Sequence, residues 1–357
     1  YNCGRGFDTT IFVRGQEYDP WVVDASVNVE DEFQRLCRLK GDEKDQQWAD
    51  RYRQYLRNRT RFKTEEDYPG ARAVREAIGW LERKTQTQKE NLFLWLDLFD
   101  PHEPWDPPPK YWDMYDADYR GQTLIDPVPG DVAGYMTPRE IQRTKSLYAG
   151  EVTYIDRWIG IFLDRLKDLG LYDNSLIVFM SDHGEPFGEH GFIRKAFPRG
   201  YEELAHIPLL VRHPDGKGRG QKIGGFVQPP DIFPTILEYL GISTRLTLQY
   251  TAPVELTFPQ DVVVSSTPVS ILGKSLLPLL DGKSEGHHDF TVTAHNERQW
   301  VIRTATHSYH YHPKKDRPNE LYDRKTDRAE KHNIISHAAE LARTMEGTLK
   351  QFVERIS

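Results

Sequence analysis

The stretch SLIVFMSDHG, residues 175–184, joins a continuous apolar run to a carboxylate and an imidazole. Apolar runs of this length, bounded by polar residues, are typical of buried strands, and Asn91–Asp97 and Ile207–Val211 are two more. A strand that is apolar on both faces indicates a parallel sheet covered by helices. The stretch therefore predicts an α/β fold that presents Asp182 and His183 at the carboxyl end of a central strand, where such folds keep their chemistry.

Helical patterns lie between these runs. Apolar residues recur at helical spacing over 71–84. Thr137, with Pro138 and Glu140 behind it, is a good helix start, and Gly170 ends the apolar face that follows. The other predicted helices are 31–57 and 231–240. Strands that alternate with helices favour a mainly parallel sheet with helices on both of its sides.

The pattern changes after about residue 280. The strands predicted there are 290–294, 300–304 and 308–312, and a closing helix is predicted over 336–356. These strands alternate like antiparallel strands with one solvated face. The chain is therefore divided into a catalytic α/β domain, 1–285, and a smaller C-terminal α+β subdomain with an antiparallel sheet, 286–357.

A group of aromatic and imidazole side chains falls on the last of these strands. Its members are His307, Tyr309, His310, Tyr311 and His312. Side chains along a strand point alternately to its two faces, so the group is split between them. We therefore expect a solvated strand here rather than a metal site.

Composition excludes several classes of function. The 357 residues carry a net charge of −7, which offers no basic footprint for nucleic acid or for an anionic membrane. Cys3 and Cys37 cannot form a disulfide framework and have no metal-ligand spacing. No run of eighteen apolar residues occurs, so no membrane span and no nucleic-acid partner are predicted.

The residues around Asp182 and His183 resemble a known pattern. Ser181–Glu185, Gly188–Gly191, Lys195 and His206–Val211 are together similar to the C-terminal metal motif of the sulfatase family, in the alkaline phosphatase superfamily. Further similar segments, in family order, are Pro101–Trp105, Tyr148–Asp156, Asp231–Thr235, Gly273–Leu280 and Glu320–Asp323. Each is weak alone, whereas the ordered set is specific. The resemblance implies an alkaline phosphatase-like fold.

The resemblance also implies roles for four residues. Asp182 and His183 would be metal ligands, Lys195 a cation on the ester oxygens, and His102 a donor near the leaving group. A metal and a lysine oppose the anionic charge of a sulfate ester, and a protonated histidine neutralises charge on the leaving oxygen. The ligand types favour Ca²⁺ and also admit Mn²⁺ or Mg²⁺.

Each assignment has a structural alternative. Asp182 could cap a helix beside a surface histidine, Lys195 could be a solvated loop lysine, and His102 could pack against prolines. Three neighbouring residues are expected to shape the loop or to support the ligands: Glu185, Glu189 and His190.

The family's nucleophile is not found in this sequence. The pattern requires paired aspartates and then Cys-x-Pro-x-Arg or Ser-x-Pro-x-Arg, whose Cys or Ser is oxidised to formylglycine. Neither Cys3 nor Cys37 lies in that setting. The resemblance thus implies that the chain begins inside the catalytic domain. We expect the chain alone to be inactive and poorly stable, with part of a sheet exposed.

The leading functional hypothesis is a formylglycine sulfatase that hydrolyses a sulfated small molecule or glycan. A phosphonate monoester or phosphodiester hydrolase of the same superfamily is the first alternative, because Asp182, His183 and Lys195 suit either tetrahedral anion. A non-catalytic sulfatase-like binding protein is the second alternative. The nucleophile segment discriminates between the enzymes, and failure to bind a divalent metal would favour the binding protein.

Overall fold

The structure, a computed structural model, describes residues 4–87, 91–195, 199–242, 273–283, 287–295 and 298–356. The chain forms two compact units, Tyr1–Ser175 with Glu185–Phe197, and Leu176–Gly184 with Pro198–Ser357. The division predicted at residue 285 stays a prediction, because the C-terminal sheet belongs to a larger unit that also contains the residues after Pro198.

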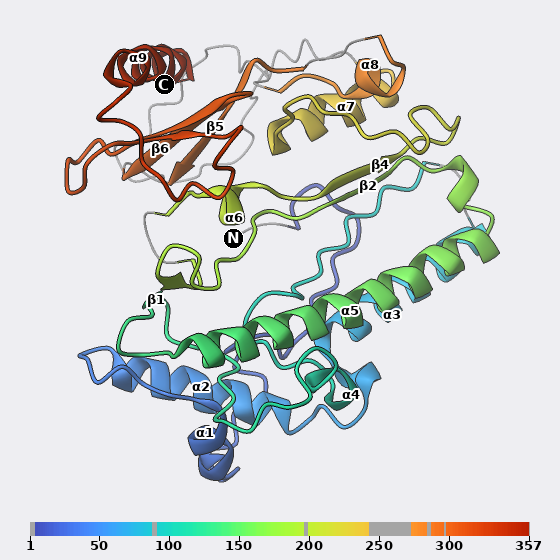
Figure 1. The fold of residues 1–357 in the computed structure, drawn as a ribbon. Helices are drawn as coiled ribbons and strands as arrows, with labels where there is room; N and C mark the ends of the chain where they lie inside the picture. Colours follow the sequence, from blue (N-terminus) through green and yellow to red (C-terminus); the bar gives the residue numbers. More distant parts are fainter. Residues whose placement is uncertain are drawn as a thin grey trace, which may run out of the picture. The chain divides into compact units, whose positions relative to one another are not determined.

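The first unit is mainly helical (Figure 1). Its elements are α1 (Glu30–Leu36), α2 (Asp45–Arg59), η1 (Glu65–Asp67), α3 (Pro69–Thr87), α4 (Pro109–Trp112), β1 (Gly130–Asp131), α5 (Pro138–Asp168), η2 (Tyr172–Asn174) and β3 (Phe192–Ile193). The predicted capping box of α5 is confirmed, because the Thr137 side chain accepts from the Glu140 backbone N–H and Glu140 reciprocates. α3 packs along α5, and the hydroxyl of Tyr154 accepts from the Ala71 N–H at 2.8 Å in their shared core.

The helix predicted over 31–57 is instead two helices. Cys37 ends α1 in an extended conformation, and Gly41 takes a φ of 81°, in the left-handed region. The Asp45 carboxylate accepts from the backbone N–H groups of Lys40 and Gly41 at 3.1 and 2.8 Å. A glycine turn, closed by the side chain of the first residue of α2, therefore separates the two helices.

The run 91–97 is not a buried strand. Phe93 and Trp95 are 53% and 65% exposed, whereas Leu96 and Leu98 pack against the core of α3 and α5. The prediction was wrong because a continuous apolar run does not reveal that only one of its faces is covered.

The second unit combines a two-stranded and a four-stranded sheet (Figure 1). Its elements are β2 (Ile177–Met180), α6 (Glu202–Ala205), β4 (Leu209–Arg212), η3 (Pro229–Asp231), α7 (Ile232–Tyr239), α8 (Leu277–Leu280), β5 (Phe290–His295), β6 (Gln299–Thr304), β7 (His307–Tyr311), β8 (Glu320–Asp323) and α9 (Ala339–Ile356). The strand order β5-β6-β7-β8 is antiparallel throughout, and α9 packs on it through Met345 and Leu349. The predicted C-terminal strands and closing helix are confirmed.

The strand that precedes Asp182 is β2, and its observed partner is antiparallel. β2 pairs with β4 so that Met180 lies opposite Leu209. Within the ranges given above, every paired strand is antiparallel, so the parallel pairing expected for the central sheet is not seen there. Phe179 and Leu210 on this pair are 42% and 59% exposed. None of the helices in those ranges combines the length and the apolar character needed to cross a bilayer.

His310 of β7 and His312 just after this strand are buried, so the predicted solvated strand is wrong. His310 and His312 are 0% and 1% exposed. Their Nε2 atoms lie 3.4 Å from Glu330 Oε1 and 3.5 Å from Glu320 Oε1, respectively. Two tyrosines also donate to Glu320, so this face of the sheet is a buried polar layer; they are Tyr201 and Tyr322. Sequence alternation identified the two faces of the strand but not that both are covered.

Candidate active site

The structure brings His102 and Lys195 together within the first unit. Lys195 follows β3, which is fixed by its pairing with β1 and by the fully buried Ile193. Lys195 Nζ lies 2.8 Å from His102 Nε2, and it donates to the two carboxylate oxygens of Glu103 at 3.1 and 2.9 Å. Two residues that are far apart in the chain and were predicted to act on one ester are therefore neighbours.

The contacts of His102 define its tautomer. Its Nδ1 lies 2.8 Å from the Glu103 carbonyl oxygen, which can only accept, so Nδ1 carries the hydrogen. Nε2 then accepts from the Lys195 ammonium. Burial, together with the positive charges of Lys195 and Arg194, lowers the pKa of His102 to about 4. His102 is therefore neutral at pH 7 in this arrangement.

A buried arginine anchors the pair, and sequence reasoning gave it no role. Arg194 Nε donates to Glu103 Oε1 at 2.8 Å, and Arg194 Nη1 donates to Asp126 Oδ1 at 2.5 Å. Tyr18 donates to the other oxygen of Asp126. Arg194 has a φ of 60°, and Glu17, whose Oε1 lies 3.7 Å from His102 Nδ1, has a φ of 42°. Non-glycine residues held in this region are costly, and they cluster at functional sites.

Three carboxyl groups around Lys195 have different electrostatic environments. Burial raises the pKa of Glu103, but the charges of Arg194 and Lys195 outweigh it and lower that pKa to about 2. Burial and the nearby charge of Glu103 raise the pKa of Glu185 to about 8 and that of Glu17 to about 7. Glu185 Oε2 lies 3.5 Å from Lys195 Nζ. At pH 7 Glu103 is therefore ionised between the two adjacent cations, and Glu185 is mostly protonated.

The substitution Glu185→Gln tests this assignment. The pKa of Glu185 is higher in the folded state than in the unfolded chain, so its stabilising contribution is full below about pH 4.5 and is lost as the pH rises through 8. Between pH 5 and pH 8 the parent should lose part of its free energy of unfolding as Glu185 ionises. Glutamine does not titrate, so the variant should not show this loss, and its free energy of unfolding should rise relative to that of the parent. Each tenfold difference in the ionisation constant between the two states corresponds to about 1.4 kcal/mol. Urea unfolding of both proteins at the two pH values measures the gain.

Glu189→Gln is the matched control on the same loop. Its carboxylate accepts from the Phe187 N–H at 2.5 Å and from Lys145 Nζ at 3.0 Å, as expected for a residue that shapes the loop. The hydrogen bonds to Glu189 lower the pKa of this carboxyl group despite its burial. The change in the free energy of unfolding caused by Glu189→Gln should therefore be the same at pH 5 and pH 8. A Glu185→Gln effect that is equal at both pH values contradicts the assignment.

Asp182 and His183 lie at the end of β2 in the second unit. The loop is held by Ser181, whose hydroxyl donates to the His183 carbonyl at 2.6 Å, and by the Gly184 N–H, which donates to the Leu204 carbonyl at 2.8 Å. Gly184 lies so close to the Glu203 carbonyl that a side chain would not fit there. The Asp182 side chain is 86% exposed.

The donor atoms of this pair fit a divalent metal. His183 Nδ1 lies 2.8 Å from the Gly184 carbonyl and must donate to it, which leaves Nε2 as the atom with a lone pair. That Nε2 lies 3.7 Å from Asp182 Oδ2. Two ligands with bonds of about 2.1 to 2.4 Å to one ion would have a similar separation. The residues present therefore fit one nitrogen and one oxygen ligand of a shared ion.

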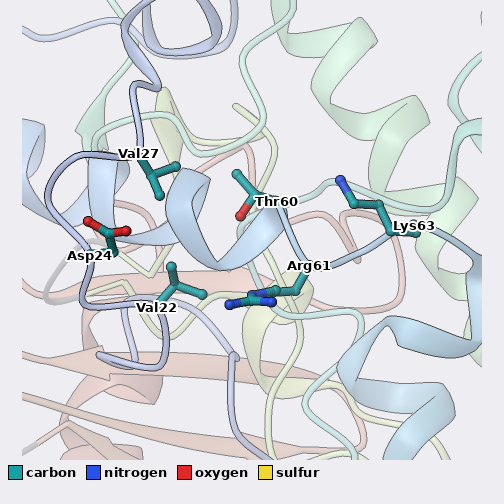
Figure 2. A pocket seen from close by; sticks show the side chains of 6 residues that line it. All are labelled: Val22, Asp24, Val27, Thr60, Arg61 and Lys63. Atoms are coloured by element: carbon teal, nitrogen blue, oxygen red, sulfur yellow. The ribbon is translucent and has the colours of Figure 1, made fainter.

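A surface pocket of about 350 Å³ lies elsewhere in the first unit. Figure 2 shows the side chains that line it, from the segment 22–27 and from the end of α2 onward. They are Val22, Asp24, Val27, Thr60, Arg61 and Lys63. None of the four predicted site residues is among them, and the Asp24 carboxylate is engaged by Ser26.

Known proteins resemble the chain in sequence and in fold. The arylsulfatase of Clostridium perfringens is 32% identical over 195 residues, which cover 49% of this chain and 39% of that protein. The N-acetylglucosamine-6-O-sulfatase of Bacteroides thetaiotaomicron is 28% identical over 264 residues, 69% of this chain and 42% of that protein. The chain thus spans about two fifths of the length of these curated relatives.

Solved structures give the same fold. The phosphonate monoester hydrolase of Agrobacterium radiobacter superposes with a TM-score of 0.65 at 21% identity, over 82% of this chain and 62% of that one. The alkaline phosphatase-like fold class is thereby confirmed. The family model described as Sulfatase matches residues 4–242, which is more than half of the chain. The chain belongs to the sulfatase family.

Proposed function

We propose that the chain forms part of a metal-dependent sulfuric ester hydrolase. The observation that carries the proposal is the contact of 2.8 Å between Lys195 Nζ and His102 Nε2, held by the buried carboxylate of Glu103. In the family pattern these two residues meet the ester oxygens and the leaving group. An ammonium and an imidazole that are pre-positioned beside each other suit an anionic ester whose leaving oxygen gains charge.

Lys195 has the donors that the sulfate oxygens need. Its ammonium directs its hydrogens to acceptor atoms on His102 and Glu103, so a sulfate oxygen that approaches Nζ would take over one of these contacts. Arg194 fixes Glu103, and Glu103 in turn fixes the direction of Nζ. His102, neutral before substrate binds, must gain a proton before it can donate to the leaving oxygen. The Lys195 ammonium, which donates to His102 Nε2, fixes the direction of the imidazole and keeps its own charge for the ester oxygens.

Asp182 and His183 would hold a divalent metal, for which we propose Ca²⁺. The bound ion would supply positive charge against the ester oxygens. The nucleophile of the proposed reaction is formylglycine, and neither cysteine of this sequence lies in the family signature for it.

A phosphonate monoester hydrolase is the second candidate, because the structure with a TM-score of 0.65 belongs to such an enzyme. The match to an N-acetylglucosamine-6-O-sulfatase supports a sulfated glycan as the substrate of the first candidate. The sulfatase family match over residues 4–242 favours the sulfate ester over the phosphonate.

The test is a substrate panel for the protein that carries this chain. An aryl sulfate, glucosamine 6-sulfate and a phenyl phosphonate are supplied at equal concentration with Ca²⁺, and we expect the highest kcat/KM on a sulfate ester. Asp182→Asn and His183→Gln should each lower it by about 10²-fold or more, since a metal ligand is lost.

Each of the other outcomes has a definite meaning. A higher kcat/KM on the phosphonate would favour the second candidate. Binding of sulfated glucosamine without turnover of any compound would indicate a binding protein. Full activity in both ligand variants would contradict the role of Asp182 and His183.

A further inference from the structure

The second unit contains a group of potential metal ligands that the proposed reaction does not use. Asp231, His287 and His288 place one ligand atom each within 4.8 Å of the others. Within the described ranges it is the one such group of three. The side chains of Asp231 and His287 are 1% and 7% exposed, and that of His288 is 17% exposed.

Asp231 is held rigidly where three segments meet. Its Oδ2 accepts from the Gln228 N–H at 2.7 Å, and its Oδ1 accepts from the Lys274 N–H at 2.8 Å. Thr235 Oγ1 donates to the Asp231 carbonyl at 2.6 Å and accepts from the Leu276 N–H at 2.8 Å. The carboxylate therefore has a fixed position before any ligand arrives.

The two imidazoles converge on one oxygen of this carboxylate. His288 Nε2 lies 2.9 Å from Asp231 Oδ1, and His287 Nε2 lies 3.7 Å from the same atom. His287 Nε2 is also 2.9 Å from the Lys274 carbonyl oxygen. The ring centroids are 4.7 Å apart and the rings are inclined at 76°. Two nitrogens and two oxygens thus surround one small region.

The segments that carry these residues are also tied to each other. The Gln228 side chain donates to the Val292 carbonyl at 2.8 Å, and Phe226 forms a β-bridge with His288. Gly273 approaches the Pro230 carbonyl too closely for any side chain. Hydrogen bonds and close packing therefore hold the donor atoms on a framework that does not depend on a bound ion.

We propose that Asp231, His287 and His288, with the Lys274 carbonyl, form a structural site for a late first-row divalent metal such as Zn²⁺. Two ligands on one tetrahedral zinc lie about 3.3 Å apart, between the two distances to Asp231 Oδ1. In the structure each Nε2 lies within hydrogen-bond distance of an oxygen acceptor and so carries the hydrogen. Each neutral imidazole would bind through Nε2 once that hydrogen has moved to Nδ1, a change of tautomer that releases no net proton. Four donors complete a closed tetrahedral shell, as in structural zinc sites.

The ligand chemistry separates this site from Asp182 and His183. Two imidazole nitrogens favour zinc, copper, nickel or cobalt, whereas Asp182 and His183 offer a single imidazole nitrogen beside a carboxylate oxygen. An ion bound at Asp231 would join the turn before α7 to the segments around Lys274 and His288. It would therefore stabilise the second unit, whatever ester the protein hydrolyses.

The test measures Zn²⁺ binding and Tm for the full chain, with free Zn²⁺ set by a chelator. His287→Gln and His288→Gln keep a hydrogen-bond donor but lose the imidazole ligand, and each should weaken zinc binding by at least about tenfold. Both should also lose the rise of Tm with zinc, while their circular dichroism in EDTA matches the parent. Ca²⁺ should not compete.

Two controls make the result specific. His332→Gln removes an imidazole that is 83% exposed and should leave binding unchanged. Asp182→Asn should also leave it unchanged, which distinguishes this site from the proposed catalytic one. Zinc affinity and Tm gain that persist in the His287→Gln, His288→Gln double variant would overturn the proposal, as would a parent chain that binds no zinc at micromolar concentration.

Discussion

Replacing Arg194 with methionine is expected to lower the free energy of unfolding by about 3–5 kcal/mol, because it leaves buried carboxylates without their partner. The Arg194 side chain is 7% exposed and bridges Glu103 and Asp126, which are 2% and 1% exposed. Glu103 keeps Lys195, whereas among the described residues Asp126 keeps the hydrogen bond from the Tyr18 hydroxyl alone. Since whole domains are stable by about 5–15 kcal/mol, the first unit should unfold at a much lower urea concentration.

The loss of stability in Arg194→Met should also depend on pH. Burial raises the pKa of Asp126 to about 6 even though Arg194 opposes the rise, so the pKa goes higher still in the variant. The folded variant then prefers a protonated Asp126. Its free energy of unfolding is lowered most at high pH, where this carboxyl group must ionise. Destabilisation should therefore be larger at pH 8 than at pH 5, which urea titrations at both values measure.

Arg35→Met is the matched control. Arg35 pairs with Glu32 at 2.7 Å, but the two side chains are 53% and 40% exposed, so water replaces the lost partner. Its effect should be a small fraction of that of Arg194→Met. Equal effects of the two substitutions would mean that burial of the Arg194 ion pairs does not contribute to stability as argued.

Local signals in the sequence predicted the elements whose formation depends on neighbouring residues. The Thr137 to Glu140 capping box begins α5, and alternation over 290–312 corresponds to β5, β6 and β7. The motif order also assigned His102 and Lys195 to one site, although 93 positions separate them. No periodicity carries that information, and it came from the family resemblance alone.

The features that sequence reasoning missed depend on what covers a side chain. Trp95 and His310 both lie in strand-like patterns, yet the first is 65% exposed and the second is fully buried. The partner of Arg194, Asp126, is 68 residues away in an irregular segment. Asp231 and His288 are 57 residues apart, and only the folded chain brings them together. Adjacency to Lys195 was the one available hint for Arg194.

Lys195→Ala is expected to lower kcat by about 10²–10³-fold in the protein that carries this chain, the cost of removing a donor that stabilises developing charge. KM should change less, because the ester's charge also meets the proposed metal. Lys195→Arg keeps the charge but presents a planar fork instead of a compact ammonium, so it should recover only part of the rate. Steady-state kinetics on a sulfate ester measure both effects.

A second readout distinguishes this role from a structural one. The Lys195 charge helps to lower the pKa of His102 to about 4, so the pKa should rise in Lys195→Ala, as NMR titration can follow. Lys145→Ala is the control, since this lysine is 51% exposed and pairs with Glu189 on the surface. It should change neither kcat nor that pKa. A Lys195→Ala protein that keeps a third or more of the parent kcat would exclude Lys195 from the reaction, and an unchanged pKa of His102 would show that the two side chains do not interact in solution.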